Sequence, residues 1–216
     1  MHLGSLCSGR TLERLEAPLN YLWLGHWLNA KGFQVGERKT TREELFQDLA
    51  RKVGDKRVLY LEFGVAQGVS MRHWSQLLTN PDSHLDGFDT FEGLPFDWKT
   101  GAVRGTFSNN GELPQIPDRR VRFFKGFFEE TLPSYQLPEH EVMIVNIDCD
   151  LYSSALYVLS RLDPHFAPGD FVYFDEFNDR QNEMRAFNDF LTSGKRRFRA
   201  AGATELYWQA LFECAE

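Results

Sequence analysis

The spacing of hydrophobic positions changes after the first quarter of the chain. Before that point, residues 11–30 (TLERLEAPLNYLWLGHWLNA) repeat apolar side chains every three to five positions, which predicts an amphipathic helix interrupted or started near Pro18. Its apolar positions are Leu12, Leu15, Leu19, Leu22 and Trp27. Residues 41–52 predict a second helix, because Thr41 and Glu44 form a capping-box pattern ahead of an apolar stripe. We expect both helices to pack against the sheet, with a lid or a dimer surface as the alternative.

From residue 56 onward, short apolar runs alternate with stretches of helical periodicity. The predicted strands are 58–63, 84–89, 121–126, 142–148 and 170–176, and the predicted helices between and after them are 67–78, 152–162 and 179–192. Strands that are apolar throughout and alternate with helices are typical of a parallel sheet covered on both faces. The C-terminal runs 198–203 and 205–214 predict a closing hairpin. The fold class is therefore α/β, a Rossmann-like doubly wound and mostly parallel sheet.

This pattern divides the chain into an N-terminal helical extension, residues 1–54, and one domain, residues 55–216. With 216 residues and 42% hydrophobic content, the chain is large enough to bury a proper core. Segment 90–120 is rich in Gly, Pro and Asn and lacks periodicity. A loop of that length in a compact domain is usually functional or mobile.

Charge and cysteine content restrict the class of partner. The formal net charge of -7 argues against broad binding to nucleic acid or anionic lipid, because both require a basic surface. The three scattered cysteines, Cys7, Cys149 and Cys214, form neither a metal-ligand spacing nor a disulfide framework and fit a reducing cytosol. Membrane-span and signal-peptide patterns are also missing from the sequence. We therefore expect a cytoplasmic protein that acts on a small molecule.

Candidate chemistry begins where the first predicted strand ends. Glu62 is followed by Gly64 and Gly68 in a strand-to-helix turn, where glycine lets a ligand approach the backbone and the helix N-terminus favours an anion. The spacing differs from the Gly-x-Gly-x-x-Gly of dinucleotide binders. Because the Glu62 carboxylate would repel a pyrophosphate and attract an amino group, the turn suits an amino-acid zwitterion.

The second predicted strand ends in Asp89, and an acid at that position suits the two hydroxyls of a ribose. An acid there is also common as a turn former. Together, Glu62 and Asp89 favour a nucleoside joined to an amino acid, and S-adenosylmethionine is such a molecule.

Acidic residues also follow the fourth and fifth predicted strands. Asp148 and Asp150 would share one face if their strand continued through both. Neighbouring strands lie about 4.8 Å apart, so Asp148, Asp175 and Glu176 would crowd one place and require a cation. Carboxylate oxygens suit Mg²⁺, with Ca²⁺ or Mn²⁺ as alternatives, and no His or Cys completes a zinc site. The competing interpretation of Asp148 and Asp150 is a helix cap and a solvated acid.

Four motifs, in this order, resemble the macrocin O-methyltransferase family. They are GFDTFEGLP at 87–95, RVRFFKGFFEETLP at 120–133, NIDCDLYSS at 146–154 and FDEF at 174–177. The resemblance covers roughly residues 58–192. It implies the class I S-adenosylmethionine-dependent methyltransferase fold, with a seven-stranded sheet and usually a Mg²⁺ site.

The resemblance also implies roles for individual residues. The implied cofactor contacts are Glu62, Gly64, Gly68 and Ser70 at the methionine end, Asp89 and Thr90 at the ribose, Phe91 and Phe127 at the adenine, and Asp148. The implied metal ligands are Asp148, Asp175 and Glu176, and Asp150 is the candidate general base. The chain departs from the family at Ala66-Gln67-Gly68, where the family often has an aromatic-Arg-Gly run, and at Asp175-Glu176, where it usually has Asp-Asp.

These observations predict an S-adenosylmethionine-dependent O-methyltransferase that acts on a hydroxyl of a small molecule of sugar or natural-product type and depends on Mg²⁺. The alternatives are a metal-independent methyltransferase, a non-catalytic S-adenosylmethionine-binding module, and a metal-dependent hydrolase, against which Glu62 and Asp89 argue. The apolar positions of residues 11–30 also permit a homodimer.

Overall fold

The computed structural model describes residues 9–98, 101–194 and 196–216, with side chains from residue 18 onward within these ranges. Cys7 and the side chains of Leu12 and Leu15 lie outside the described residues. Across the described part of the chain, every helix is too short or too polar to span a lipid bilayer.

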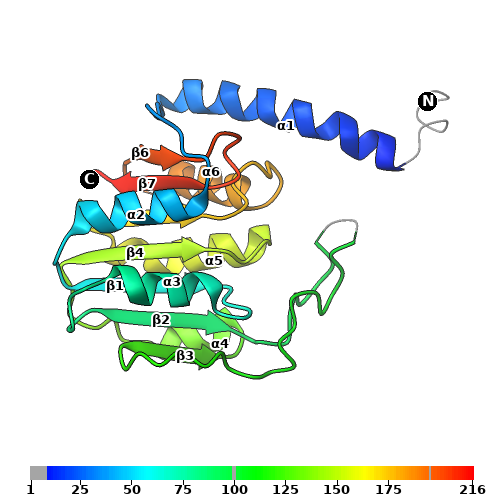
Figure 1. The fold of residues 1–216 in the computed structure, drawn as a ribbon. Coiled ribbons are helices and arrows are strands. Elements are labelled where there is room, and N and C mark those ends of the chain that lie inside the picture. Colours follow the sequence, from blue (N-terminus) through cyan, green and yellow to red (C-terminus); the bar gives the residue numbers. More distant parts are fainter. Residues whose placement is uncertain (1–8, 99–100, 195) are drawn as a thin grey trace.

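The described residues form one seven-stranded sheet in the order β3-β2-β1-β4-β5-β7-β6 (Figure 1). The strands are β1 (Val58–Phe63), β2 (His84–Asp89), β3 (Val121–Lys125), β4 (Val142–Ile147), β5 (Phe171–Phe174), β6 (Phe198–Ala203) and β7 (Ala210–Cys214). Strands β1 to β5 are parallel, and β7 pairs antiparallel with β5 and β6. The predicted α/β class, the parallel sheet and the closing hairpin are confirmed.

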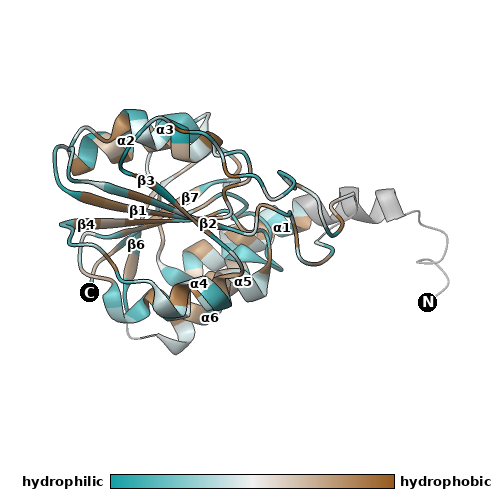
Figure 2. Ribbon diagram, turned by 90° about the horizontal axis from the view of Figure 1, so that it is seen from below, coloured by the Kyte–Doolittle hydropathy of each residue, from teal (hydrophilic) through white to brown (hydrophobic). Residues whose placement is uncertain are grey.

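Helices cover both faces of the sheet (Figure 2). They are α1 (Gly9–Lys31), α2 (Arg42–Val53), α3 (Val69–Leu77), α4 (Phe128–Thr131), α5 (Tyr152–Leu162) and α6 (Glu183–Ser193). One core lies between the sheet and helices α1, α5 and α6, and the second lies between the sheet and helices α2 and α3. Because β1 and β4 are buried at every position, they read as continuous apolar runs, as expected for strands covered on both faces.

The direction of strand order reverses between β1 and β4. From β1 the chain proceeds through α3 to β2 and β3 on one side, and β4 and β5 lie on the other side. In doubly wound sheets, ligands bind beyond the carboxyl ends of the strands at this reversal. The turn after Phe63 and the turn after Ile147 meet at that point, where the Asp148 N–H donates to the Phe63 carbonyl oxygen at 2.9 Å.

Two sequence predictions differ from the structure in detail. Helix α1 runs through Pro18 without interruption, because the missing N–H removes only one helical hydrogen bond while the downstream half packs against the core through Trp27. Strand β4 ends at Ile147, so Asp148 and Asp150 follow the strand and do not share one of its faces. Asp150 also adopts a left-handed conformation, with φ 63°, which is incompatible with an extended strand at that residue.

The long segment between β2 and β3 has no helix or strand among its described residues, 90–98 and 101–120. Its chain nevertheless pairs with itself, because the Leu94 N–H donates to Thr106 O and the Gly105 N–H to Leu94 O, both at 2.9 Å. The segment projects from the carboxyl end of β2 (Figure 1).

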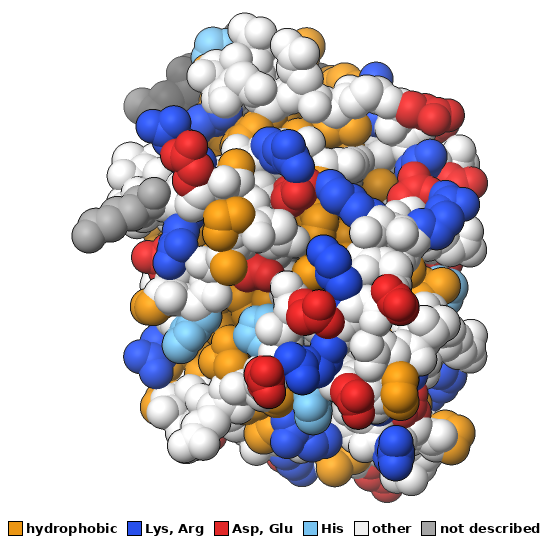
Figure 3. Space-filling model, turned by 90° about the vertical axis from the view of Figure 1, so that its left-hand side faces the viewer, with side chains coloured by type: hydrophobic (Ala, Val, Ile, Leu, Met, Phe, Trp, Pro, Cys, Tyr) orange, Lys and Arg blue, Asp and Glu red, His pale blue; other side chains and the backbone are white. Residues whose placement is uncertain are grey.

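Figure 3 shows the opposite side of the molecule, at the amino ends of the parallel strands, where Lys and Arg are interspersed with Asp and Glu.

Candidate functional site

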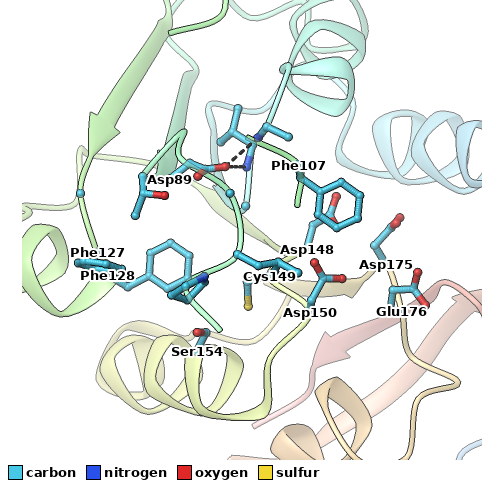
Figure 4. A pocket seen from close by; sticks show the side chains of 18 of the residues that line it. Asp89, Phe107, Phe127, Phe128, Asp148, Cys149, Asp150, Ser154, Asp175 and Glu176 are labelled. Atoms are coloured by element: carbon cyan, nitrogen blue, oxygen red, sulfur yellow. Dashed lines mark hydrogen bonds between the residues drawn. The ribbon is translucent and has the colours of Figure 1, made fainter. Parts of the chain in front are cut away.

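A pocket of about 330 Å³ opens at the carboxyl ends of β1, β2, β4 and β5 (Figure 4). Its lining includes Gly64, Asp89, Thr90, Leu94, Phe107, Phe127, Phe128, Asp148, Asp150, Ser154, Asp175 and Glu176. The structure therefore brings together residues from every strand end that the sequence selected. The long segment after β2 contributes Leu94 and Phe107, which gives it a place in the site.

The turn after β1 depends on two glycines. Gly64 has φ 91°, and a Cβ atom there would overlap the carbonyl oxygen of Asp148. Glycine is therefore required for the close approach of the β1 and β4 ends. Gly68, with φ 71°, is the left-handed N-cap of α3, and a Cβ atom there would press against Pro114.

Asp89 organises the same turn from the neighbouring strand. Its Oδ2 accepts the N–H groups of Val65 at 2.7 Å and Ala66 at 2.8 Å, and its Oδ1 accepts the N–H of Phe91 at 2.7 Å. Asp89 therefore has the turn-forming role that the sequence also allowed. Asp89 and Thr90 also line the pocket. A carboxylate has about four acceptor positions, so three N–H donors leave Asp89 able to accept from a ligand.

Glu62 is almost completely buried at the end of β1. The Tyr60 hydroxyl donates to its Oε2 at 2.9 Å, and the Asn146 amide donates to that hydroxyl at 2.9 Å. Burial raises the pKa of Glu62 to about 8, against the smaller opposing effects of the Tyr60 hydrogen bond and the Arg42 charge. Glu62 lines a second cavity of about 250 Å³ that also contacts Ser70.

The acids after β4 and β5 converge on the main pocket (Figure 4). Burial, together with the charges of Asp175 and Glu183, raises the pKa of Asp148 well above its ordinary value. Asp175 accepts the Tyr173 hydroxyl at 2.9 Å and lies 3.5 Å from the Arg42 guanidinium. Carboxyl groups this close together favour either a proton or a cation between them.

For the predicted Mg²⁺ site, the type of donor atom fits the ion, whereas the arrangement of the described side chains does not yet form a binding site. Asp148, Asp175 and Glu176 present only carboxylate oxygens, the ligands that Mg²⁺ prefers. Within the described residues, however, no three His, Cys, Asp or Glu side chains are already arranged to hold a metal ion. The donor set fits the ion, and its binding stays a prediction.

The two phenylalanines predicted at the adenine are placed differently. Phe127 is half-exposed and lines the pocket. The Phe91 side chain is fully buried, with its ring 5.8 Å from the ring of Phe123, and it is not among the residues that line the pocket. Phe91 approaches the site only through its backbone N–H bond to Asp89. Phe128, which the sequence did not single out, lines the pocket beside Phe127.

Sequence reasoning also missed two charged residues. Glu183, fully buried at the start of α6, accepts the N–H of Asp150 at 3.3 Å and the N–H of Glu176 at 3.1 Å, which ties the two acidic turns together. Arg42 reaches the acids from α2. Glu183 falls within an expected amphipathic helix and Arg42 directly follows a capping Thr, so neither position differs in sequence from an ordinary surface charge.

Comparison with known proteins supports the motif assignment. Residues 101–197 match the family model described as Macrocin-O-methyltransferase (TylF). The resemblance to the macrocin O-methyltransferase family is confirmed. The matched residues include Asp148, Asp150, Asp175 and Glu176, whereas Glu62 and Asp89 precede the match.

Two curated relatives of this chain are described as O-methyltransferases. One is the 8-demethyl-8-(2,3-dimethoxy-alpha-L-rhamnosyl)-tetracenomycin-C 4'-O-methyltransferase of Streptomyces olivaceus, 37% identical over 75 residues, or 35% of this chain. The other is the mycinamicin III 3''-O-methyltransferase of Micromonospora griseorubida, 29% identical over 96 residues, or 44% of this chain. The alignments span 26% and 35% of the relatives' own lengths.

The likeness to solved structures concerns the fold alone. The structure of CalS11, described as a calicheamicin methyltransferase, superimposes with a TM-score of 0.63 at 24% identity, covering 80% of this chain and 78% of that chain. The class I methyltransferase fold predicted from the sequence is therefore confirmed.

Proposed function

We propose that the protein is an S-adenosylmethionine-dependent O-methyltransferase that methylates a hydroxyl of a small molecule of sugar or natural-product type. The observation that supports it most is one continuous arrangement at the strand-order reversal. Glu62 and Asp89 suit the two ends of the cofactor, and Asp148 and Asp150 lie beside them in adjoining cavities. The match to the macrocin O-methyltransferase family model and the two relatives described as O-methyltransferases support the same reaction class.

In the proposed reaction, the protein aligns an acceptor hydroxyl with the methyl group of the cofactor, and this alignment supplies most of the rate acceleration. Asp150 accepts the hydroxyl proton. The C–S bond of the sulfonium breaks as the C–O bond forms, so S-adenosylhomocysteine and a methyl ether leave the site. A Mg²⁺ ion held by Asp148, Asp175 and Glu176 would supply Lewis acidity that lowers the pKa of the acceptor hydroxyl.

The proposal also assigns functions to the two parts of the chain that the sequence pattern distinguishes. Residues 55–216 would bind the cofactor, and residues 1–54 would extend the domain. A cytoplasmic location stays a prediction, and the apolar positions of residues 11–30 permit a homodimer without requiring one.

The first test is calorimetric titration of the full chain with S-adenosylhomocysteine, in Mg²⁺ and again in chelator. We expect micromolar binding in at least one buffer. Absence of binding at millimolar ligand in both buffers would remove the proposal. Binding without turnover on any glycosylated or sugar-nucleotide acceptor would favour the non-catalytic module, and turnover that survives the chelator would favour a metal-independent enzyme.

Asp150→Asn tests the base. We expect kcat to fall by about 10²- to 10⁴-fold while S-adenosylhomocysteine affinity changes little, because the amide keeps the shape and loses the ability to accept the proton. Release of S-adenosylhomocysteine measures the rate. Asp55→Asn, at an exposed position between α2 and β1, is the matched control and should leave kcat unchanged. Full activity of Asp150→Asn would exclude Asp150 as the base.

A further inference from the structure

A second cavity adjoins the main pocket on the side of α2 and α3. Its volume is about 250 Å³, and it shares Asp148, Val65, Ala66 and Phe107 with the main pocket. Its charged and polar lining consists of Arg42, Glu62, Gln67, Ser70, Ser108 and Asp148. A cationic side chain and a buried acid thus line one small volume next to the proposed methyl-transfer site.

Arg42 is held in this cavity by the start of α2. It is the first residue of the helix, directly after the N-cap Thr41, whose capping box with Glu44 fixes the helix start. Its side chain is only 28% exposed, and its guanidinium lies 3.5 Å from Asp175 and 3.3 Å from Glu43. A guanidinium has five N–H donors, so contacts of this length leave donors for a ligand.

The start of α3 adds a second feature that favours an anion. The helix begins at Val69, and its N-cap Gly68 has no side chain with which to cap the first N–H groups. The positive end of the helix dipole therefore faces the cavity beside the buried Ser70. The guanidinium and this helix end attract a carboxylate, while Glu62 attracts an ammonium group.

We propose that Arg42 binds the carboxylate of the cofactor's amino-acid end, so that the N-terminal extension supplies one wall of the cofactor site. The inference rests on the proposed function, and it assigns a role to a residue outside the family match. The planar guanidinium can hold a carboxylate through two parallel N–H···O bonds. The pairing with Asp175 then lets the same side chain connect the cofactor to the acids of the transfer site.

The test compares two ligands that differ by the amino-acid end. Arg42→Met keeps the apolar stem and removes the charge. We expect the affinity for S-adenosylhomocysteine to fall on the order of 10- to 100-fold, as for a lost charge-assisted hydrogen bond, and the affinity for 5'-methylthioadenosine to change less than about twofold. Calorimetric titration measures both, and Arg42→Lys should recover part of the loss.

A third ligand distinguishes the proposed contact of Arg42 with the carboxylate from the contact of Glu62 with the ammonium group. The decarboxylated form of S-adenosylhomocysteine keeps the ammonium, so wild type and Arg42→Met should bind it equally. A parallel loss for this ligand, or for 5'-methylthioadenosine, would mean that Arg42 acts through Glu62 or the fold and would overturn the inference. Equal binding of S-adenosylhomocysteine by wild type and Arg42→Met would overturn it as well. Failure of the wild type to bind S-adenosylhomocysteine would instead remove the proposed function.

The matched control is Arg51→Met. Arg51 lies on the same helix, is 75% exposed and pairs with Asp48 away from the cavity. Its replacement removes the same charge from α2, so affinity for S-adenosylhomocysteine should stay at the wild-type value. If Arg51→Met lost as much affinity as Arg42→Met, the effect would come from net charge alone, and the inference would be overturned.

Discussion

Among single residues, Glu62 is almost completely buried and lines the cavity proposed for the amino-acid end of the cofactor. It is 1% exposed, and burial raises its pKa to about 8. Near neutral pH the unliganded protein therefore holds Glu62 mostly protonated, and the Tyr60 hydroxyl is its hydrogen-bond partner. An ammonium group placed beside it would favour the ionised form. The proposed cofactor can thus change the protonation state of the site that receives it.

We predict that binding of S-adenosylhomocysteine at pH 7 releases nearly one proton. The ligand ammonium is already charged at that pH, so the proton comes from Glu62. Titration in two buffers of different ionisation enthalpy measures the release, which should disappear in Glu62→Gln together with much of the affinity. Identical enthalpies in the two buffers would contradict the prediction.

The same residue makes the unliganded protein sensitive to pH. Its pKa is raised from the ordinary value of 4.5 to about 8, so between these values the folded protein holds a proton that the unfolded chain releases. The Glu62 contribution to stability is present below pH 4.5 and declines as pH rises through about 8. The slope of unfolding free energy against pH should therefore be less negative in Glu62→Gln than in wild type.

At the scale of elements, Arg120 fixes the end of α3 whose start forms the site. Its guanidinium donates to the carbonyl oxygens of Ser75 at 2.6 Å, Leu78 at 2.6 Å and Asn80 at 2.9 Å, and it pairs with Asp118 at 2.7 Å. The last carbonyl groups of a helix lack helical partners, and a cation there also complements the helix dipole. One side chain thus connects the approach to β3 with the end of α3.

Arg120→Met should lower the free energy of unfolding by about 3 kcal/mol, because it leaves three carbonyl groups and the Asp118 carboxylate without their partner. Urea unfolding followed by circular dichroism measures the change. The adjacent Arg119 is exposed, so Arg119→Met should change stability by less than about 0.5 kcal/mol. Equal effects of the two substitutions would show that the Arg120 contacts do not hold α3.

The sequence predicted the elements whose hydrophobic pattern follows directly from their burial. Strands β1, β4 and β5 are buried at every position because helices cover both faces of the sheet there. Glu62, Asp89, Asp148 and Asp175 were selected because parallel strands end at one edge of a sheet. Sequence periodicity does not show which distant helix reaches that edge. Arg42 therefore escaped prediction, since its position depends on how α2 packs against the second core.

At the scale of the molecule, the N-terminal extension takes part in both cores. Leu24, Trp27, Leu28 and Phe33 belong to the cluster that contains Phe177, Phe187 and Phe212, and Leu45, Phe46, Leu49 and Val53 of α2 pack on the other face of the sheet. In a layered domain, elements that share a core unfold together. The extension should therefore be thermodynamically inseparable from the sheet, although the sequence pattern divides them.

Trp27 tests this cooperativity. Its ring lies 5.4 Å from that of Phe33 and 5.8 Å from that of Phe177, and its indole N–H donates to Asn188 Oδ1 at 2.8 Å. Trp27→Ala should lower the free energy of unfolding by about 3 to 5 kcal/mol, since it leaves a cavity and an unpaired amide. Fluorescence and circular dichroism should still report one coincident transition. Trp23→Ala, at a 42% exposed position on the same helix, should cost far less. An early separate transition in Trp27→Ala would mean that α1 unfolds independently of the sheet, and the extension would then be a docked segment and not part of the domain core.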